Sequence, residues 1–376
     1  MTAVAILGSG VMGSALAVPL ADNGHDVRLV GTHRDRDIIE SIRLDGVHPG
    51  LDVELPRSVQ AYQLEDAQAA FAGAEIVLSG VNSFGVRWAS DQLSRLLPHN
   101  VLVIAIAKGL EATDQGDLRI LPDVLTDCWS EQQRAAASVS AIVGPSIAGE
   151  VAVRRDTCVV FAGRDQRALD RLAALFRTRR YRVWSSTDVI GCEVCAAMKN
   201  CYALGAGLAE GVLEAREGAD SQHRMHNYEA ALLAQGAEEM RQMVTLLGGR
   251  PETAGALPGV GDMYVTSTGG RNVRVGRLLG SGMRFTEAWE QLDHITLEGA
   301  AAIREIGGAL PKLSEREIIG AGDFPLLRHL YEIVALERPV EMPWSSFFGG
   351  DSATAPRSAP TDGRAEALAE PPHADV

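Results

Sequence analysis

Residues 3–13 read Ala-Val-Ala-Ile-Leu-Gly-Ser-Gly-Val-Met-Gly, and this stretch decides the fold class. A short apolar run leads directly into glycines in the spacing Gly-x-Gly-x-x-Gly, and residues 14–23 then show a helical pattern. Gly8 would allow a tight turn, Gly10 a close approach of the backbone to a ligand, and Gly13 close packing of the helix on the strand. The stretch therefore predicts a strand, a phosphate-binding turn and a helix whose N-terminal N–H groups face an anion.

Further apolar runs alternate with helical stretches as far as residue 187. These candidate strands lie at 27–30, 76–79, 101–105, 141–143, 159–162 and 181–184. The alternation predicts an α/β fold, with a Rossmann-like N-terminal domain at 1–187 whose parallel sheet is covered by helices on both faces.

From about Gly191 the strand signals stop. Helical periodicity follows at 193–213, 227–247, 285–292 and 298–306. We therefore expect an all-helical C-terminal domain at 188–345, which would hold the substrate and the catalytic groups. Residues 346–376 are rich in Ala, Pro, Ser and Asp, and we expect them to form a disordered tail.

The composition is that of a globular protein, and it excludes several classes. The formal net charge of −14 argues against binding to nucleic acid or to anionic lipid. No apolar run approaches the roughly 20 residues that a membrane helix needs. The N-terminus shows no basic stretch or cleavage site of a secretory signal, so we expect a cytoplasmic protein.

The cysteines could bind a metal or pack in the core. Cys192 and Cys195 form a Cys-x-x-Cys, and His223 and His226 follow as His-x-x-His, which are spacings that zinc sites use. Both cysteines, however, fall within an apolar helical pattern. We interpret them as small core residues and predict no metal site.

Lysine is scarce in this chain. Of 35 basic residues only Lys108, Lys199 and Lys312 are lysines, and the rest are arginines. Arg cannot exchange a proton near neutral pH, whereas a desolvated Lys can. A lysine retained against this bias is therefore a candidate for proton chemistry.

Four more segments accompany the glycine motif. They read Ile-Ala-Lys-Gly-Leu-Glu at 106–111, Gly-Pro-Ser-Ile-Ala-Gly-Glu at 144–150, Glu-Val-Cys-Ala-Ala-Met-Lys-Asn at 193–200, and Gly-Val-Gly-Asp-Met-Tyr-Val-Thr at 259–266 with Gly-Gly-Arg-Asn at 269–272. Together, and in this order, the five motifs resemble the NAD(P)-dependent glycerol-3-phosphate dehydrogenase family over residues 3–345.

The resemblance implies reduction of dihydroxyacetone phosphate to sn-glycerol 3-phosphate, which is reversible. It implies that Lys199 exchanges the proton on the substrate oxygen, that Lys108 contacts both substrate and cofactor, and that Asp262 lies beside the catalytic lysine. The residue types suit this chemistry. A buried ammonium beside a second cation has a lowered pKa and can give up its proton near neutral pH.

The resemblance also implies the binding residues. We expect the substrate to contact the catalytic residues and also Gly144, Ser146, Asn200, Thr266, Arg271 and Asn272, the last two at its phosphate. We expect the cofactor to contact Gly8, Ser9, Gly10, Val11, Met12, Gly13, Thr32, Arg34, Lys108, Ala148, Arg271 and Glu298.

The end of the second strand bears on the choice between NADPH and NADH. No carboxylate stands at the strand end for the ribose 2′-hydroxyl of NAD, and Arg34 and Arg36 lie close by. This favours NADP slightly. Asp35 could still reach the ribose, and the two arginines could equally be solvated surface charges.

Departures from the family pattern keep alternatives open. Met12 stands where an aromatic residue is usual, and Gln235 precedes Gly236 where Arg is common. The chain could thus be a paralogue acting on another phosphorylated ketose or polyol. A 3-hydroxyacid or ketopantoate-type reductase, or a non-catalytic dinucleotide sensor, would share the glycine motif. The resemblance further implies a homodimer, formed through the helical domain.

Overall fold

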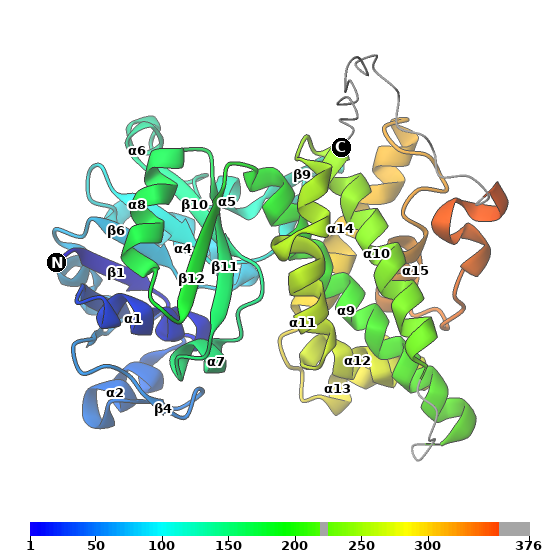
Figure 1. Ribbon diagram of the computed structural model, residues 1–376, viewed down its shortest axis with the longest axis horizontal. Coiled ribbons are helices and arrows are strands. Elements are labelled where there is room, and N and C mark those ends of the chain that lie inside the picture. Colours follow the sequence, from blue (N-terminus) through cyan, green and yellow to red (C-terminus); the bar gives the residue numbers. More distant parts are fainter. Residues whose placement is uncertain (219–224, 353–376) are drawn as a thin grey trace, which may run out of the picture.

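The computed structural model describes residues 1–218 and 225–352 and shows two lobes side by side, an α/β lobe and a helical lobe (Figure 1). An eight-stranded sheet forms the centre of the first lobe, in the order β12-β11-β10-β7-β6-β1-β2-β5. Its strands are β1 (Ala3–Leu7), β2 (Asp26–Val30), β5 (Gln60–Tyr62), β6 (Ile76–Ser79), β7 (Leu102–Ala105), β10 (Ser138–Val143), β11 (Thr157–Gly163) and β12 (Tyr181–Ser186).

Helices cover both faces of this sheet, as the alternating pattern predicts. Each face has its own buried apolar cluster, one formed with α1 and α8 and the other with α3, α4 and α5. The helices are α1 (Val11–Asp22), α2 (Arg36–Asp45), α3 (Ala67–Phe71), α4 (Val86–Leu96), α5 (Leu121–Val124), α6 (Glu131–Ala136), α7 (Ala148–Ala152) and α8 (Gln166–Phe176). The Rossmann-like prediction is confirmed for this lobe.

Two features of the sheet differ from the sequence prediction. β11 runs antiparallel to β10, so β11 and β12 point opposite to the six parallel strands. The connection from β10 to β11 contains one helix, the five-residue α7, which packs on α1. A parallel neighbour would need a longer crossover helix over the face of the sheet, so β11 returns antiparallel to β10. Two hairpins were also not predicted: β3 (Val47–His48) with β4 (Val53–Glu54), and β8 (Leu110–Ala112) with β9 (Leu118–Ile120).

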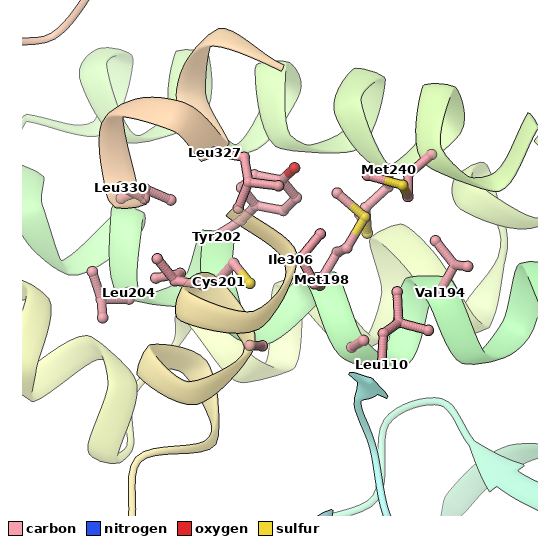
Figure 2. Packing of buried hydrophobic residues seen from close by; sticks show 14 of the residues in the cluster. Leu110, Val194, Met198, Cys201, Tyr202, Leu204, Met240, Ile306, Leu327 and Leu330 are labelled. Carbon is pink, nitrogen blue, oxygen red and sulfur yellow. The ribbon is translucent and has the colours of Figure 1, made fainter. Parts of the chain in front are cut away.

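The helical lobe is built around one long helix, α9 (Val189–Glu217). Around it lie α10 (His226–Leu246), α11 (Asp262–Ser267), α12 (Arg271–Gly280), α13 (Phe285–Gln291), α14 (Glu298–Glu315) and α15 (Pro325–Leu336). Figure 2 shows side chains of α9, among them Met198 and Tyr202, packed against Met240 of α10 and Leu327 of α15. Within the described residues no strand follows β12, so this lobe is helical as expected.

Helices α9 and α12 touch through their backbones. A Cβ added at Gly207 of α9 would lie 2.2 Å from the oxygen of Val273, and one added at Gly276 of α12 would lie 2.0 Å from the oxygen of Leu204. Gly211 and Gly280 extend the same contact by one turn. Because any side chain at these four positions would separate the helices, the glycines fix how closely α12 approaches the helix that carries Lys199.

The helical lobe extends beyond the boundary predicted from composition. The 3-10 segment η5 (Trp344–Ser352) continues the structure past residue 345. Phe347 is buried and stacks edge-on with Trp344, which in turn stacks on Tyr228 of α10. These aromatic contacts order residues that the composition assigned to the tail, and 353–376 lie outside the described residues. In the described part of the chain, no helix is long and apolar enough to cross a membrane.

Candidate active site

The glycine loop between β1 and α1 has the geometry of a phosphate-binding turn. Gly8 has φ +110°, and a Cβ there would lie 2.9 Å from the backbone carbon of Gly80. A Cβ at Gly13 would lie 2.3 Å from the oxygen of Gly8, whereas one at Gly10 would meet no atom within 4 Å. α1 begins at Val11, which is 45% exposed. The loop thus leaves open space at Gly10, in front of the free N–H groups of the first helical turn.

The loop after β2 brings Thr32 and Asp35 together. Oδ2 of Asp35 accepts a hydrogen bond from the backbone N–H of Thr32 at 2.9 Å. Arg36 is ion-paired with Glu65, so it is engaged at the protein surface. Arg34 is exposed, and its side chain has no partner among residues 1–218 and 225–352. Of the two arginines, Arg34 is the one free to receive a ligand.

A buried carboxylate holds two lysines where the lobes meet. Asp262, the first residue of α11, accepts from Nζ of Lys199 at Oδ1 (2.6 Å) and from Nζ of Lys108 at Oδ2 (2.9 Å). Lys199 also donates to Oγ1 of Thr266 at 2.9 Å, and Lys108 donates to the carbonyl of Gly144 at 3.2 Å. Lys199 and Asp262 are 6% and 1% exposed. The structure therefore brings these five predicted residues into one cluster.

The electrostatics of this cluster separate the two lysines. Burial, and after it the positive charge of Lys108, lower the pKa of Lys199 to about 7, although Asp262 opposes both effects. Burial alone would also lower the pKa of Lys108, but attraction to Asp262 and the hydrogen bond with it raise that pKa above its ordinary value. Lys108 therefore stays a cation, and Lys199 is a proton donor or acceptor near neutral pH.

A second set of hydrogen-bonded polar groups begins at Asn200, the residue after Lys199. Nδ2 of Asn272, on α12, donates to Oδ1 of Asn200 at 3.4 Å, and Oδ1 of Asn272 accepts from the N–H of Gly299 at 3.1 Å. Glu298, which begins α14, contributes to the raised pKa of Lys108 through its negative charge. Asn200, Asn272 and Glu298 thus lie around the lysine cluster rather than at separate sites.

Arg271 lies at the N-terminus of α12, directly after Gly270, whose φ is +98°. Its side chain is exposed and has no partner in the described part of the chain. The guanidinium and the free N–H groups of the first helical turn together form a cationic end to α12. The next residue, Asn272, hydrogen-bonds to Asn200, which follows Lys199 in α9.

The loop from β10 to α7 joins the lysine cluster to the glycine loop. Gly144, with φ +97°, offers its carbonyl to Lys108. Two residues later, Oγ of Ser146 lies 3.8 Å from Sδ of Met12. Ala148 begins α7, which packs on α1. The predicted substrate and cofactor residues of this loop therefore lie between the two halves of the site.

Two residues near the site were not predicted. His48 hydrogen-bonds to the glycine loop, and Glu193 is a buried carboxyl on α9, six residues before Lys199. His48 gave no sequence signal, because a lone His has no motif around it. Glu193 begins the motif at 193–200, but no role was predicted for it. A cavity of about 500 Å³ lies elsewhere, lined by Trp184, Cys192 and Leu257 among others, and neither lysine lines it.

The cysteines of the possible zinc motif lie in the core. Cys192 and Cys195 are fully buried in α9, and burial raises the pKa of the Cys192 thiol to about 12. His223 lies outside the described residues, and His226 begins α10. Among the residues that the structure describes, no three His, Cys, Asp or Glu side chains gather as metal ligands would.

Comparisons with known proteins match both lobes. The sequence pattern of the NAD-dependent glycerol-3-phosphate dehydrogenase N-terminus matches residues 3–169, and that of the C-terminus matches 188–344. A relative from Archaeoglobus fulgidus named NADP(+)-dependent glycerol-3-phosphate dehydrogenase is 37% identical over 292 residues, which is 77% of this chain and 83% of that protein. A relative from Shouchella clausii named glycerol-3-phosphate dehydrogenase [NAD(P)+] is 31% identical over 89% of this chain and 92% of its own.

Solved structures agree with these matches. The crystal structure of glycerol-3-phosphate dehydrogenase from Coxiella burnetii superposes with a TM-score of 0.73 at 28% identity, over 91% of this chain and 96% of that one. The family that the five motifs resemble is therefore confirmed over both lobes. The chain belongs to the NAD-dependent glycerol-3-phosphate dehydrogenase family.

Proposed function

We propose that the protein catalyses the reversible, NAD(P)-dependent reduction of dihydroxyacetone phosphate to sn-glycerol 3-phosphate. The observation that carries this proposal is the buried cluster in which Asp262 holds both Lys199 and Lys108. The cluster provides an acid with a pKa of about 7 beside a permanent cation. Reduction of a ketone needs this pair, because a proton is given to oxygen while negative charge develops there.

In this function Lys199 gives its proton to the carbonyl oxygen. Lys108 stays charged and stabilises the developing alkoxide, and Asp262 orients both ammonium groups. Thr266 accepts a hydrogen bond from Lys199 and limits the directions in which its ammonium can point. A bound nicotinamide dinucleotide would supply the hydride to the carbonyl carbon.

The substrate phosphate is assigned to the N-terminus of α12. Arg271 offers a guanidinium fork without a competing partner in the described residues, and Asn272 lies beside it. The open space at Gly10 and the N-terminus of α1 fit the pyrophosphate of the dinucleotide. In this proposal Gly144, which contacts Lys108, and Ser146, which contacts Met12, hold the ketone between these two anion sites.

NADPH is the proposed preferred cofactor. Arg34 is unpaired in the described part of the chain, next to Thr32, and suits the 2′-phosphate of NADP. Arg36 is held by Glu65, and Asp35 already accepts a backbone hydrogen bond. Neither residue is therefore as available as Arg34 to bind the 2′-phosphate that distinguishes NADP from NAD.

The protein is further proposed to be a cytoplasmic homodimer. The helical lobe exposes Leu336, Trp344 and Phe348, which a partner subunit could cover. All five cysteines are free thiols, which fits a reducing compartment. Sedimentation of the purified protein would test the dimer.

The experiment that tests the function follows NADPH and NADH absorbance with dihydroxyacetone phosphate present. We expect oxidation by the wild type and a loss of at least a hundredfold in Lys199→Ala, as is typical when a general acid is removed. Lys312→Ala is the matched control, because Lys312 is the remaining lysine and is exposed on α14. A folded wild type that turns over neither cofactor would overturn the substrate assignment.

A further inference from the structure

The hairpin β3–β4 reaches the glycine loop through one buried side chain. His48 is 1% exposed, and its Nε2 lies 2.9 Å from the carbonyl oxygen of Ser9. Nδ1 of the same ring accepts from the backbone N–H groups of Gly50 at 3.1 Å and Leu51 at 3.2 Å. Both ring nitrogens are therefore committed to main-chain groups.

These contacts determine the tautomer of His48. A neutral imidazole has one N–H donor and one acceptor nitrogen. Because Nδ1 receives two N–H donors, it carries no proton, and the proton must be on Nε2. The ring thus donates a hydrogen bond to the carbonyl of Ser9, and the hairpin turn holds the ring in the orientation that does so.

Ser9 is held from its other side as well. Its backbone N–H donates to Oδ2 of Asp35 at 3.2 Å, and its carbonyl also accepts from Oγ of Ser14 at 3.1 Å. The peptide units before and after Ser9 are therefore both fixed by side chains from outside the loop. Without such contacts, the glycines at 8 and 10 would leave these peptides free to rotate.

The fixed carbonyl determines the direction of a phosphate donor. A trans peptide is planar, so its C=O and N–H point in opposite directions. When His48 holds the carbonyl of Ser9 on the hairpin side, the N–H of Gly10 must point the other way. That N–H belongs to the N-cap of α1, and a Cβ added at Gly10 would meet no atom within 4 Å, so there is open space beside it.

We propose that His48 is a positioning residue that pre-orients the glycine loop for the pyrophosphate of the dinucleotide. The inference rests on the proposed function, in which this loop binds NADPH or NADH. His48 does not touch the ligand. It acts through the Ser9–Gly10 peptide, and it lowers the reorganisation that binding would otherwise require.

The test compares His48→Leu with His48→Gln. Leu removes both polar contacts, whereas the amide of Gln can still donate to the carbonyl of Ser9 and accept from the hairpin. His25→Leu is the matched control, since His25 also contacts a main-chain oxygen, that of Leu175, but follows the far end of α1. If the Leu variant does not fold, His48→Met removes the same hydrogen bonds with a more adaptable side chain.

The readouts are the Kd for NADPH, from fluorescence titration, and the steady-state constants. We expect His48→Leu to weaken NADPH roughly tenfold, about 1.4 kcal/mol at 25 °C, while kcat and the KM for dihydroxyacetone phosphate change less than about twofold. The Gln variant should recover most of the affinity, and His25→Leu should match the wild type.

Three results would overturn the inference: unchanged NADPH binding in His48→Leu, a Gln variant no better than Leu, or an equal loss in kcat and in both KM values. The last would indicate general damage to the fold. Failure of the proposed function can be told apart from failure of this inference. If the proposed function is wrong, the wild type itself will either bind no dinucleotide or will not oxidise it when dihydroxyacetone phosphate is present.

Discussion

Lys199 and Asp262 are 63 residues apart in the chain, yet Nζ of one lies 2.6 Å from Oδ1 of the other inside the protein. The carboxylate opposes the fall in the pKa of Lys199 that burial and Lys108 cause. The acidity of the proposed proton donor is thus a balance between three charged groups.

The first prediction concerns this balance. Lys199 must carry its proton to reduce a ketone, so kcat/KM for reduction should fall as pH rises through about 7. The reverse reaction needs the neutral amine and should rise over the same range. In Asp262→Asn the pKa of Lys199 loses the effect that raises it, so both midpoints should move to lower pH. Initial rates from pH 5.5 to 9 in both directions would show this, and an unmoved midpoint would contradict it.

The second prediction concerns cofactor choice. Arg34→Ala should raise the KM for NADPH about tenfold to a hundredfold, since hydrogen bonds to charged groups contribute about 1.5–3 kcal/mol, and should leave the KM for NADH unchanged. Arg36→Ala is the control, because Arg36 is paired with Glu65 and should have a smaller effect. Equal losses with both cofactors would show that Arg34 does not read the 2′-phosphate.

The third prediction concerns Glu193, which is fully buried and whose oxygens have no hydrogen-bond partner in the described part of the chain. Burial raises its pKa from 4.5 to about 8. Because the folded chain binds the proton of Glu193 more tightly than the unfolded chain does, the contribution to stability is complete below pH 4.5. As the pH rises from 4.5 towards 8, the free energy of unfolding falls by up to about 1.4 kcal/mol per pH unit. Glu193→Gln should remove this loss.

Urea unfolding at pH 5.5 and pH 8.5 measures the effect. The free energy of unfolding of Glu193→Gln minus that of the wild type should be larger at pH 8.5 than at pH 5.5. Glu290→Gln, on the exposed side of α13, should follow the wild type at both. A difference that does not change with pH would mean that Glu193 ionises normally in the fold.

The fourth prediction concerns the glycine contact between α9 and α12. In Gly276→Ala the new Cβ would lie 2.0 Å from the oxygen of Leu204, so α12 must move away from α9. We expect a loss of about 1–3 kcal/mol in stability and a higher KM for dihydroxyacetone phosphate, because Arg271 moves with the helix. Gly308→Ala is the control: its Cβ would have its nearest contact at 3.6 Å, and thermal unfolding should show little change or a gain.

Periodicity in the sequence was enough to predict most of the fold. Strand β6 lies where the apolar run at 76–79 places it, and α1, α9 and α10 end within a few residues of their predicted bounds. The reversed direction of β11 could not be predicted, because strand direction depends on how the chain crosses the sheet and not on the strand's own residues. α12 was missed because Gly269 and Gly270 precede it and Gly276 and Gly280 lie within it, and glycine is typical of loops.

The site could be predicted in part. The motifs singled out Lys108, Lys199 and Asp262, and the structure brings them together. The pairing of Arg36 with Glu65 and the bond from His48 to Ser9 could not be predicted, since each joins residues from separate segments with no motif. Such contacts emerge only when the fold brings loops together.

The meeting of backbones at Gly207 and Gly276 has a consequence for how the substrate of this protein could change. Where helices meet through side chains, their separation varies with each substitution, but here no side chain intervenes. In the proposed function this contact sets the interval between the group that gives the proton and the helix end that takes the phosphate. The length of the substrate that fits is then fixed by the packing of these two helices. A descendant that accepts a longer or shorter chain must change the turn at 267–270 or the arm of Arg271, and not the helices themselves.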